Sequence, residues 1–436
     1  MQMKTPLKRW RLRVTPLTPV HVGSGETIEP YQYLLREGEI WVLDPTALME
    51  FLPSEATKRY IEALAEGPVH ARETLLEIAN RYDLSKAIVW RGKTGVQLEN
   101  HLRNALRAGR GELGIRLFPR SLRGPYLPGS SLKGAIRTAF IFGRTQEELE
   151  ADFDDEEGDW VGQYDYVYKK VESDHKTGRT PFDWVKTSGR GRIRLLERLI
   201  ENNKRKAMEA SQRYEAHLLH HWGARREGNR EPPPLDITRD PFRALGVADS
   251  SPIAKTEFRL VKVFGSKKRG EENEPTGTAI PTEVWHSGSI EVTITFHEAL
   301  ATDRRSPLHV IRNRKGAVLG REPTKVPTLE AIAGAAYDRY ILLADSERLE
   351  YESRGWLVAA RTMDRVVEAI ESCLNNEGAL RKPLRFPLRL GFGSGSLTLR
   401  LAEFLTYEDT GRIKPVSRMF AEDQPMGWVL VEVLEG

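Results

Sequence analysis

Arg9-Trp10-Arg11-Leu12-Arg13-Val14 is a stretch whose side-chain character changes at every residue. Its even-numbered members are apolar and its odd-numbered members are arginines. A period of two predicts a β-strand with one apolar face and one row of guanidinium groups. Pro16 and Pro19 cannot donate to a central ladder, and Gly23 and Gly25 permit positive φ. We therefore expect the strand to end there and a tight polar loop to follow.

Strand and helix patterns are mixed along the rest of the chain. Strands are predicted over 31–43 (a pair), 256–264, 289–296 and 428–434, and helices over 55–65, 71–82, 132–142, 327–345 and 355–375. A further helix starts at Asp44-Pro45, and residues 87–127 read as short strands and loops. Hairpin and crossover spacings both occur, which predicts an α+β fold with antiparallel sheets backed by helices.

The chain length favours more than one structural unit. A chain of 436 residues exceeds one ordinary core, and residues 150–189 are irregular and highly charged. A helical pattern over 192–221 then leads to Pro232-Pro233-Pro234, a stiff linker. We expect an N-terminal domain at 1–149, a partly helical insertion with its linker at 150–235, and a C-terminal domain at 236–436.

Composition excludes several classes of protein. No window approaches eighteen uninterrupted apolar residues, and the first residues contain no apolar signal core, so we expect a cytoplasmic protein with no membrane association. Cys373 is the single cysteine, which excludes an intrachain disulfide and a thiolate zinc site. We predict no cofactor and no metal. A net charge of +4 permits nucleic-acid binding without requiring it.

Residues 129–137 combine a helix start with two cations. Gly129-Ser130-Ser131 is an N-cap signal, and helix N-termini present N–H groups that attract anions. Lys133 and Arg137 stand four residues apart and therefore share a helix face. The segment is a candidate phosphate cradle, although it is not a Walker loop. The alternative is a capped helix with two solvated cations.

A second glycine-rich stretch occupies residues 390–396, with glycines at 391, 393 and 395. Such glycines let a backbone approach a ligand closely, and the nearby Arg389 suits phosphate. The spacing is not that of a dinucleotide fingerprint. A glycine-rich hairpin turn is the alternative interpretation. His21, beside the glycines at 23 and 25, is a candidate general base, but no partner acid or base lies at usable spacing.

Taken in order, these motifs resemble the RAMP superfamily of CRISPR-associated proteins. Residues 17–25 resemble its N-terminal signature, residues 128–137 its P-G-S-S-x-K-G-x-x-R signature, and residues 390–396 its C-terminal glycine-rich loop. Residues 240–250 resemble the D-P-f-r-x-L-x-v-x-D-S stretch of type III members, and residues 426–429 resemble the last strand. Within the superfamily, the chain is most similar to the fifth-numbered subunit of type III-A Csm effector complexes.

The resemblance implies tandem RRM-like (ferredoxin-like) domains and no catalytic centre. It implies binding to the 3′ region of a CRISPR guide RNA, next to the filament-forming RAMP subunit and other Csm subunits, with nucleases recruited for guide maturation. The arginine row of residues 9–13 agrees with contact to an RNA backbone. RNA contact is assigned to His21, Gly23, Ser24, Gly25, Gly129, Ser130, Ser131, Lys133, Gly134, Arg137, Arg389, Gly391, Gly393, Ser394 and Gly395.

Two other functions remain open at this point. One is a metal-independent guide-processing endoribonuclease that uses His21 as its base, and the other is the analogous structural subunit of a type III-B complex. If the RNA path crosses residues 23–25, 130–137 and 391–395, then Lys133→Glu or Arg137→Glu weakens RNA binding uniformly across sequences and lowers its salt dependence.

Overall fold

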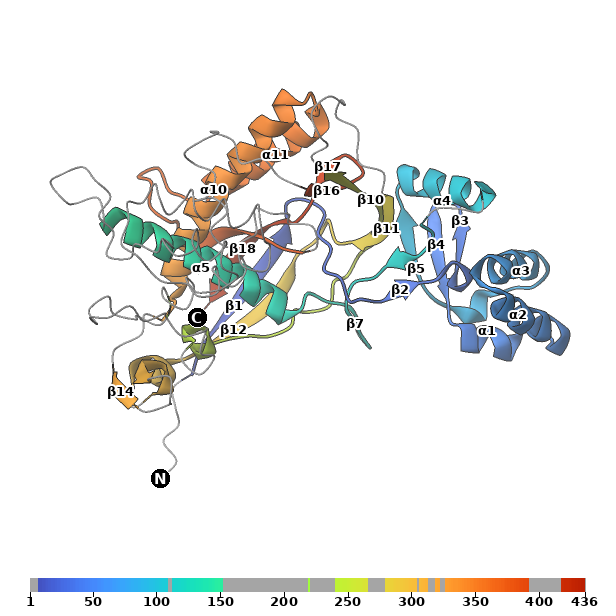
Figure 1. The fold of residues 1–436 in the computed structure, drawn as a ribbon, viewed down its shortest axis with the longest axis horizontal. Coiled ribbons are helices and arrows are strands. Elements are labelled where there is room, and N and C mark those ends of the chain that lie inside the picture. Colours follow the sequence, from blue (N-terminus) through green and yellow to red (C-terminus); the bar gives the residue numbers. More distant parts are fainter. Residues whose placement is uncertain are drawn as a thin grey trace, which may run out of the picture.

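The structure is a computed structural model, and it describes residues 7–108, 112–151, 219, 240–265, 279–303, 306–312, 318–321, 326–391 and 417–435. Helices and antiparallel strands are mixed in it, as the sequence predicts (Figure 1). Most of the predicted insertion, and the predicted contact residues Gly393, Ser394 and Gly395, lie outside the described residues.

A five-stranded antiparallel sheet, here called the central sheet, forms the middle of the described structure. Its strand order is β15 (Arg385–Arg389), β18 (Trp428–Glu435), β1 (Leu7–Pro16), β12 (Ile290–His297) and β9 (Leu245–Val247). In β1, Leu12 and Val14 are buried in the core and Trp10 packs partly buried against it. The odd-numbered arginines are exposed, which confirms the predicted alternation.

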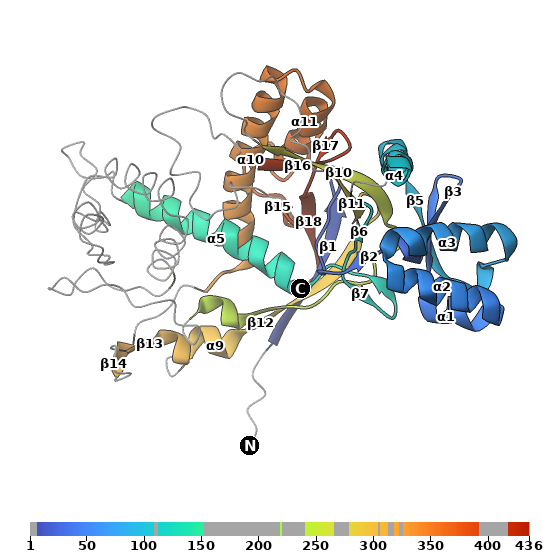
Figure 2. The same cartoon turned by 45° about the vertical axis from the view of Figure 1, so that its right-hand side comes forward.

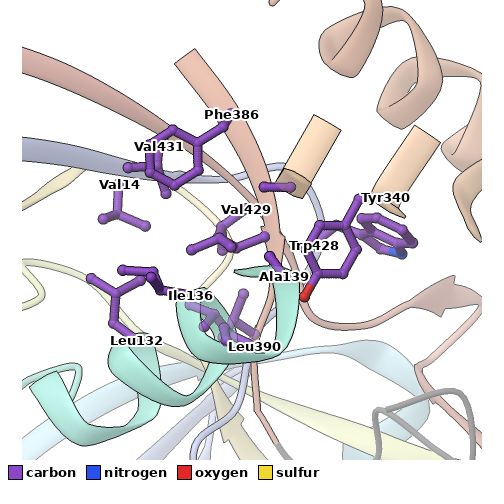
Figure 3. Packing of buried hydrophobic residues seen from close by; sticks show 14 of the residues in the cluster. Val14, Leu132, Ile136, Ala139, Tyr340, Phe386, Leu390, Trp428, Val429 and Val431 are labelled. Carbon is purple, nitrogen blue, oxygen red and sulfur yellow. The ribbon is translucent and has the colours of Figure 1, made fainter. Parts of the chain in front are cut away.

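Three helices cover the apolar face of the central sheet (Figure 2). They are α5 (Gly129–Ala151), α10 (Leu329–Ser353) and α11 (Leu357–Glu371). Leu132 and Ile136 of α5 and Tyr340 of α10 gather with Trp428 and Val429 of β18 in one buried cluster (Figure 3). This packing fixes the N-terminal half of α5 beside the sheet.

A second, larger sheet, here called the lateral sheet, extends to one side. Its strands run in the order β2 (Thr27–Ile28), β6 (Ile115–Arg116), β11 (Ala279–Val284), β10 (Glu257–Gly265), β5 (Ile88–Thr94), β4 (Glu39–Leu43) and β3 (Tyr33–Arg36), with β16 (Ser417–Ala421) and β17 (Gln424–Pro425) attached through β10. Tyr33 and Val42 pack toward α4 (Val96–Ala108), whereas their neighbours Leu34 and Leu43 pack toward α1 (Pro45–Phe51), α2 (Ser54–Glu66) and α3 (Pro68–Arg81). Opposite faces of the sheet are therefore both covered there.

Short elements complete the described structure. They are η1 (Pro30–Gln32), η2 (Ser85–Ala87), β7 (Arg120–Ser121), β8 (Gly124–Pro125), η4 (Pro241–Ala244), α9 (Glu298–Thr302), η5 (Pro307–His309), β13 (Val310–Arg312) and β14 (Val318–Arg321). No described helix is both long and apolar enough to cross a bilayer.

Most predicted elements are confirmed, but β11 and β15 were not predicted, and α10 continues to Ser353 beyond the predicted end at 345. Asp44 caps α1 as predicted, since its carboxylate accepts a hydrogen bond from Thr46 N at 2.8 Å. The interval 87–127 contains α4, which the prediction of strands and loops missed; Leu98 and Leu102 form its buried stripe at a spacing of four. The helix predicted over 132–142 continues to residue 151.

Strands from both ends of the chain share each sheet. In the central sheet, β1 pairs with β12 and with β18, and in the lateral sheet β5 pairs with β10 and β6 with β11. The segments 1–149 and 236–436 therefore interleave in both sheets, and the sites built by their loops draw on both segments.

Candidate nucleic-acid interface

Residues 17–22, directly after β1, are tied by backbone hydrogen bonds to two other segments. Leu17 N and Thr18 N both donate to Trp428 O, at 2.9 and 3.2 Å. Val20 and Trp285 exchange two backbone hydrogen bonds of 2.8 Å. The segment is thus held as firmly as a strand, although its prolines keep it out of a regular ladder.

His21 is buried within this segment. Its Nδ1 lies 2.7 Å from the backbone oxygen of Glu283, and its ring meets Phe118 edge-on at 5.4 Å. Because a carbonyl oxygen only accepts, Nδ1 carries the proton. Burial is the main cause that lowers the pKa of His21 to about 4, so the ring is neutral at pH 7. His21 therefore supports the loop at residues 23–25 from the protein interior.

Gly23, Ser24 and Gly25 form the exposed loop that follows His21. Ser24 donates from both its backbone N and its Oγ to Leu117 O, at 3.2 and 3.0 Å. Gly25 has a φ of +84°, in the region that favours glycine. The loop therefore has a fixed path and no bulky side chain at either glycine.

Gly391, at the start of the C-terminal glycine-rich stretch, lies directly on His21. With a φ of +92°, its backbone is so close that an added Cβ would stand 2.1 Å from His21 O. Two glycine-containing motifs from opposite ends of the chain therefore meet at one point.

Arg389 has an internal partner. Its guanidinium forms an ion pair with Glu347 of α10 and lies 5.2 Å from the centroid of the Trp428 ring. Its side chain is only 1% exposed. This burial leaves no exposed face for a phosphate, so we assign Arg389 to holding β15 on α10, which corrects its predicted place among the contact residues.

The N-terminus of α5 packs on residues 240–250. Gly129 N donates to Asp249 Oδ1 at 2.8 Å, and an added Cβ on Gly129 would stand 2.3 Å from Val247 O. One N–H of the predicted anion cradle is thus already engaged by a carboxylate of the same chain.

The two cations of α5 also reach residues 240–250. Lys133 Nζ donates to Leu245 O at 2.7 Å, and Arg137 Nη1 lies 2.6 Å from Asp240 Oδ2. The Arg137 side chain is 12% exposed and lies over the Phe242 ring. Two motifs that appear separate in the sequence therefore form one packing unit, which the prediction of solvated or phosphate-bound cations did not anticipate.

Smaller residues of the same helix turn face outward. Ser130 and Gly134 are exposed, Ser131 is half-buried, and nothing lies within 4 Å of a Cβ placed on Gly134. This turn is therefore open at Ser130 and Gly134.

Glu283 of β11 is a residue that sequence reasoning missed. It is fully buried, and its carboxylate accepts from Phe118 N at 3.0 Å, from Thr256 Oγ1 at 2.5 Å and from the Arg120 guanidinium. Burial raises the pKa of this carboxyl group, although its partners oppose that shift. The only signal in the sequence is a glutamate inside the apolar run 279–285.

Through Glu283 the loop at 23–25 is supported from below on two sides. The backbone oxygen of Glu283 holds His21, and its carboxylate holds Phe118, next to the Leu117 carbonyl that binds Ser24. Within the described ranges, no group of three or more His, Cys, Asp or Glu residues is arranged to hold a metal ion. The site consists of loops that are held by hydrogen bonds to buried residues.

Comparison with known proteins gives the family. The sequence profile of the RAMP superfamily matches residues 13–396, which include the loop at 23–25, the start of α5 and Gly391. The chain belongs to the RAMP superfamily. A search of curated proteins found no match.

Solved structures of other proteins share this fold. A chain of a Csm–crRNA–target RNA ternary complex from a type III-A CRISPR-Cas system aligns with a TM-score of 0.62 and 22% identity, covering 98% of this chain and 100% of that chain. Csm5 from T. onnurineus aligns with a TM-score of 0.55 and 21% identity, covering 97% of this chain and 100% of its own. Both likenesses extend over the full length of the compared chains.

Proposed function

We propose that this RAMP protein is the guide-RNA-binding subunit that caps the 3′ end of a type III-A CRISPR effector complex. Its partners are then the guide RNA, the filament-forming RAMP subunit, other Csm subunits and the nucleases that trim the guide. Full-length likeness to Csm5 and to a chain of a Csm–crRNA complex supports the proposal, as do the RAMP motifs in their order. We also propose that the central sheet and the lateral sheet derive from two tandem RRM-like domains.

The observation that carries the proposal is the junction of Gly391 with His21. It joins the two glycine-containing motifs under an exposed loop whose path is fixed by Ser24. Gly23 and Gly25 add no side chain to this loop, which suits close approach of a sugar–phosphate backbone of any sequence.

The contact surface that we propose is smaller than the predicted one. It consists of Gly23, Ser24, Gly25, Ser130, Ser131, Gly134 and Gly391, with Gly393, Ser394 and Gly395 as further predicted members. Lys133 contributes through the donors of its ammonium group that Leu245 O does not use. His21, Gly129 and Arg137 hold the loops in place through His21–Glu283, Gly129–Asp249 and Arg137–Asp240.

We further propose that the subunit does not cleave RNA. A general base must reach the attacking hydroxyl and have a pKa near the working pH. His21 is 2% exposed, donates through Nδ1 to a backbone carbonyl, and has a pKa of about 4. These properties favour a supporting role over the endoribonuclease alternative.

The test is co-expression of the chain with type III-A subunits and a CRISPR array, followed by sequencing of the RNA that copurifies. We expect guide RNA with a defined 3′ boundary that is lost or shifted when this chain is omitted. A chain that stays outside the complex and cleaves repeat RNA by itself would refute the proposal.

A matched pair of variants makes the same test specific to the surface. Ser130→Glu with Gly134→Glu adds two negative charges to exposed positions, and Ser130→Gln with Gly134→Gln adds similar volume without charge. We expect the protein with two glutamates to lose guide RNA, because negative charge repels phosphate, and the protein with two glutamines to retain most of it.

A further inference from the structure

The exposed face of the central sheet carries a row of cations on one strand. Arg9, Arg11 and Arg13 of β1 all lie on this face and are exposed. The aromatic residues of β1 and β12, Trp10 and Phe296, lie on the opposite face and pack against each other at 6.2 Å. On these two strands, the open face therefore presents the guanidinium groups, and its one aromatic ring is that of His297 at the end of β12, opposite Leu7.

The neighbouring strand supplies hydroxyl groups in register with the row. Thr295 of β12 pairs with Arg9, and Thr293 pairs with Arg11. Guanidinium groups beside hydroxyl groups are donors that suit phosphate oxygens. At the end of β1 that carries Arg9, the exposed face therefore favours the binding of an anion.

Carboxylates balance the row at its other end. Arg13 lies 3.1 Å from Glu432, which also pairs with Arg385, and Arg11 lies 3.9 Å from Glu291. Arg11 and Arg13 are about half exposed, and exposed ion pairs contribute little. A phosphate chain could exchange for these carboxylates at a small cost.

The spacing of the row is set by the strand. Alternate residues of an antiparallel strand are about 6.8 Å apart, at about 3.4 Å per residue. An extended ribose–phosphate backbone repeats every six covalent bonds, a comparable length. A single strand could thus place successive phosphates at Arg9, Arg11 and Arg13, whereas a duplex follows a helical path and could not.

We propose that the open face of the central sheet is a second RNA surface, which holds the phosphates of an extended single-stranded segment along β1. The inference rests on the proposed function, because it takes the guide RNA as the ligand. It adds a site of different chemistry: the loops at 23–25 and 130–134 offer backbone groups, and the β1 row offers fixed cations.

The variant that tests the proposal is Arg9→Gln with Arg11→Gln and Arg13→Gln. Its matched control is Lys58→Gln with Arg81→Gln and Lys86→Gln, which removes the same charge from exposed positions of α2, α3 and η2. The isolated full chain is titrated with fluorescent oligouridine at several salt concentrations. We expect the slope of log affinity against log salt to fall by about 2 in the β1 variant, at about 0.7 per single-strand phosphate contact, and to stay unchanged in the control.

A second measurement uses the assembled complex. After ribonuclease treatment, we expect a shorter protected 3′ segment of guide RNA with the β1 variant than with wild type or control. An equal slope and an equal protected length would overturn the β1 proposal. A single Arg9→Gln variant, with an expected slope change of about 0.7, keeps the test valid if the triple variant folds poorly.

The two proposals can fail separately. If the isolated chain shows the β1-dependent slope but never enters the complex, the 3′ cap proposal falls and the β1 surface stands. If the chain caps the guide and the β1 variant behaves as wild type in both measurements, the cap stands and the β1 surface falls.

Discussion

The start of α5 and the loop at 23–25 look alike in the sequence, yet the cations of α5 point into the protein and the loop is exposed to solvent. Both combine glycine and serine, and α5 adds two cations. In α5 the cations turn inward, to Leu245 O and Asp240, while the loop at 23–25 faces outward over the buried His21. The comparison teaches that a charged, glycine-rich motif can serve packing, and that exposed backbone is the better guide to a contact surface.

We expect the largest effect from a variant that disrupts the inward-facing contacts of α5. Arg137→Glu sets a carboxylate against Asp240 in a mostly buried site, and we expect it to lower the free energy of unfolding by roughly 3–5 kcal/mol. Chemical denaturation measures the loss. The double variant Arg137→Glu with Asp240→Arg should recover only part of it, because Asp240 also caps η4 through Phe242 N. Wild-type stability in the single variant would contradict this account.

The support of the outward-facing loop should depend on pH. Because His21 has a pKa of about 4 when folded and about 6.5 when unfolded, the unfolded chain binds more protons between these values. Stability is then fully present above pH 6.5 and falls by about 3 kcal/mol as pH drops to 4.

His21→Asn provides the control for this prediction, since its amide can still donate to Glu283 O. Glu283, whose pKa is raised by burial, favours folding at low pH and acts in the opposite sense. The difference between wild type and His21→Asn across pH therefore isolates the histidine. If the free energy of unfolding changes with pH equally in the two proteins, His21 is not a buried, neutral ring.

The glycines of the two motifs allow a finer comparison. Gly391→Ala adds a Cβ that would meet His21 O, and we expect a loss of about 2–3 kcal/mol. Gly25→Ala has a similar positive φ but open space, so we expect about 1 kcal/mol. Thermal unfolding of both variants compares them directly, and equal losses would show that the approach of Gly391 to His21 is unimportant.

The smallest change in stability should accompany a clear change in binding. Gly134→Glu places a charge on the exposed side of α5, and we expect the stability to change by less than about 1 kcal/mol, since glycine is a poor helix former. RNA affinity should fall about three- to tenfold through repulsion of phosphate. Gly134→Gln is the matched control, and an equal affinity for the two variants would remove this helix turn from the contact surface.

The sequence was sufficient for features encoded locally. The alternation at residues 9–14 predicted β1 and its arginine face, and the cap at Asp44 predicted the start of α1. It was insufficient where the partner lies far along the chain. Nothing near Lys133 or Arg137 indicates that residues 240–250 accept their hydrogen bonds. Likewise, a single glutamate in an apolar run does not predict the four contacts of Glu283.

The N-terminal strand β1 lies between two strands from later parts of the chain, and one of them, β18, is the last described strand. Because β1 pairs with β12 and β18, the ribosome must release residues 428–435 before the central sheet can close. The β12 edge of residues 7–16 must therefore stay unpaired until residues 290–297 are made, and the β18 edge until residues 428–435 are made. Nascent chains would need protection of this edge, and a prematurely terminated chain could not offer the finished surface to RNA.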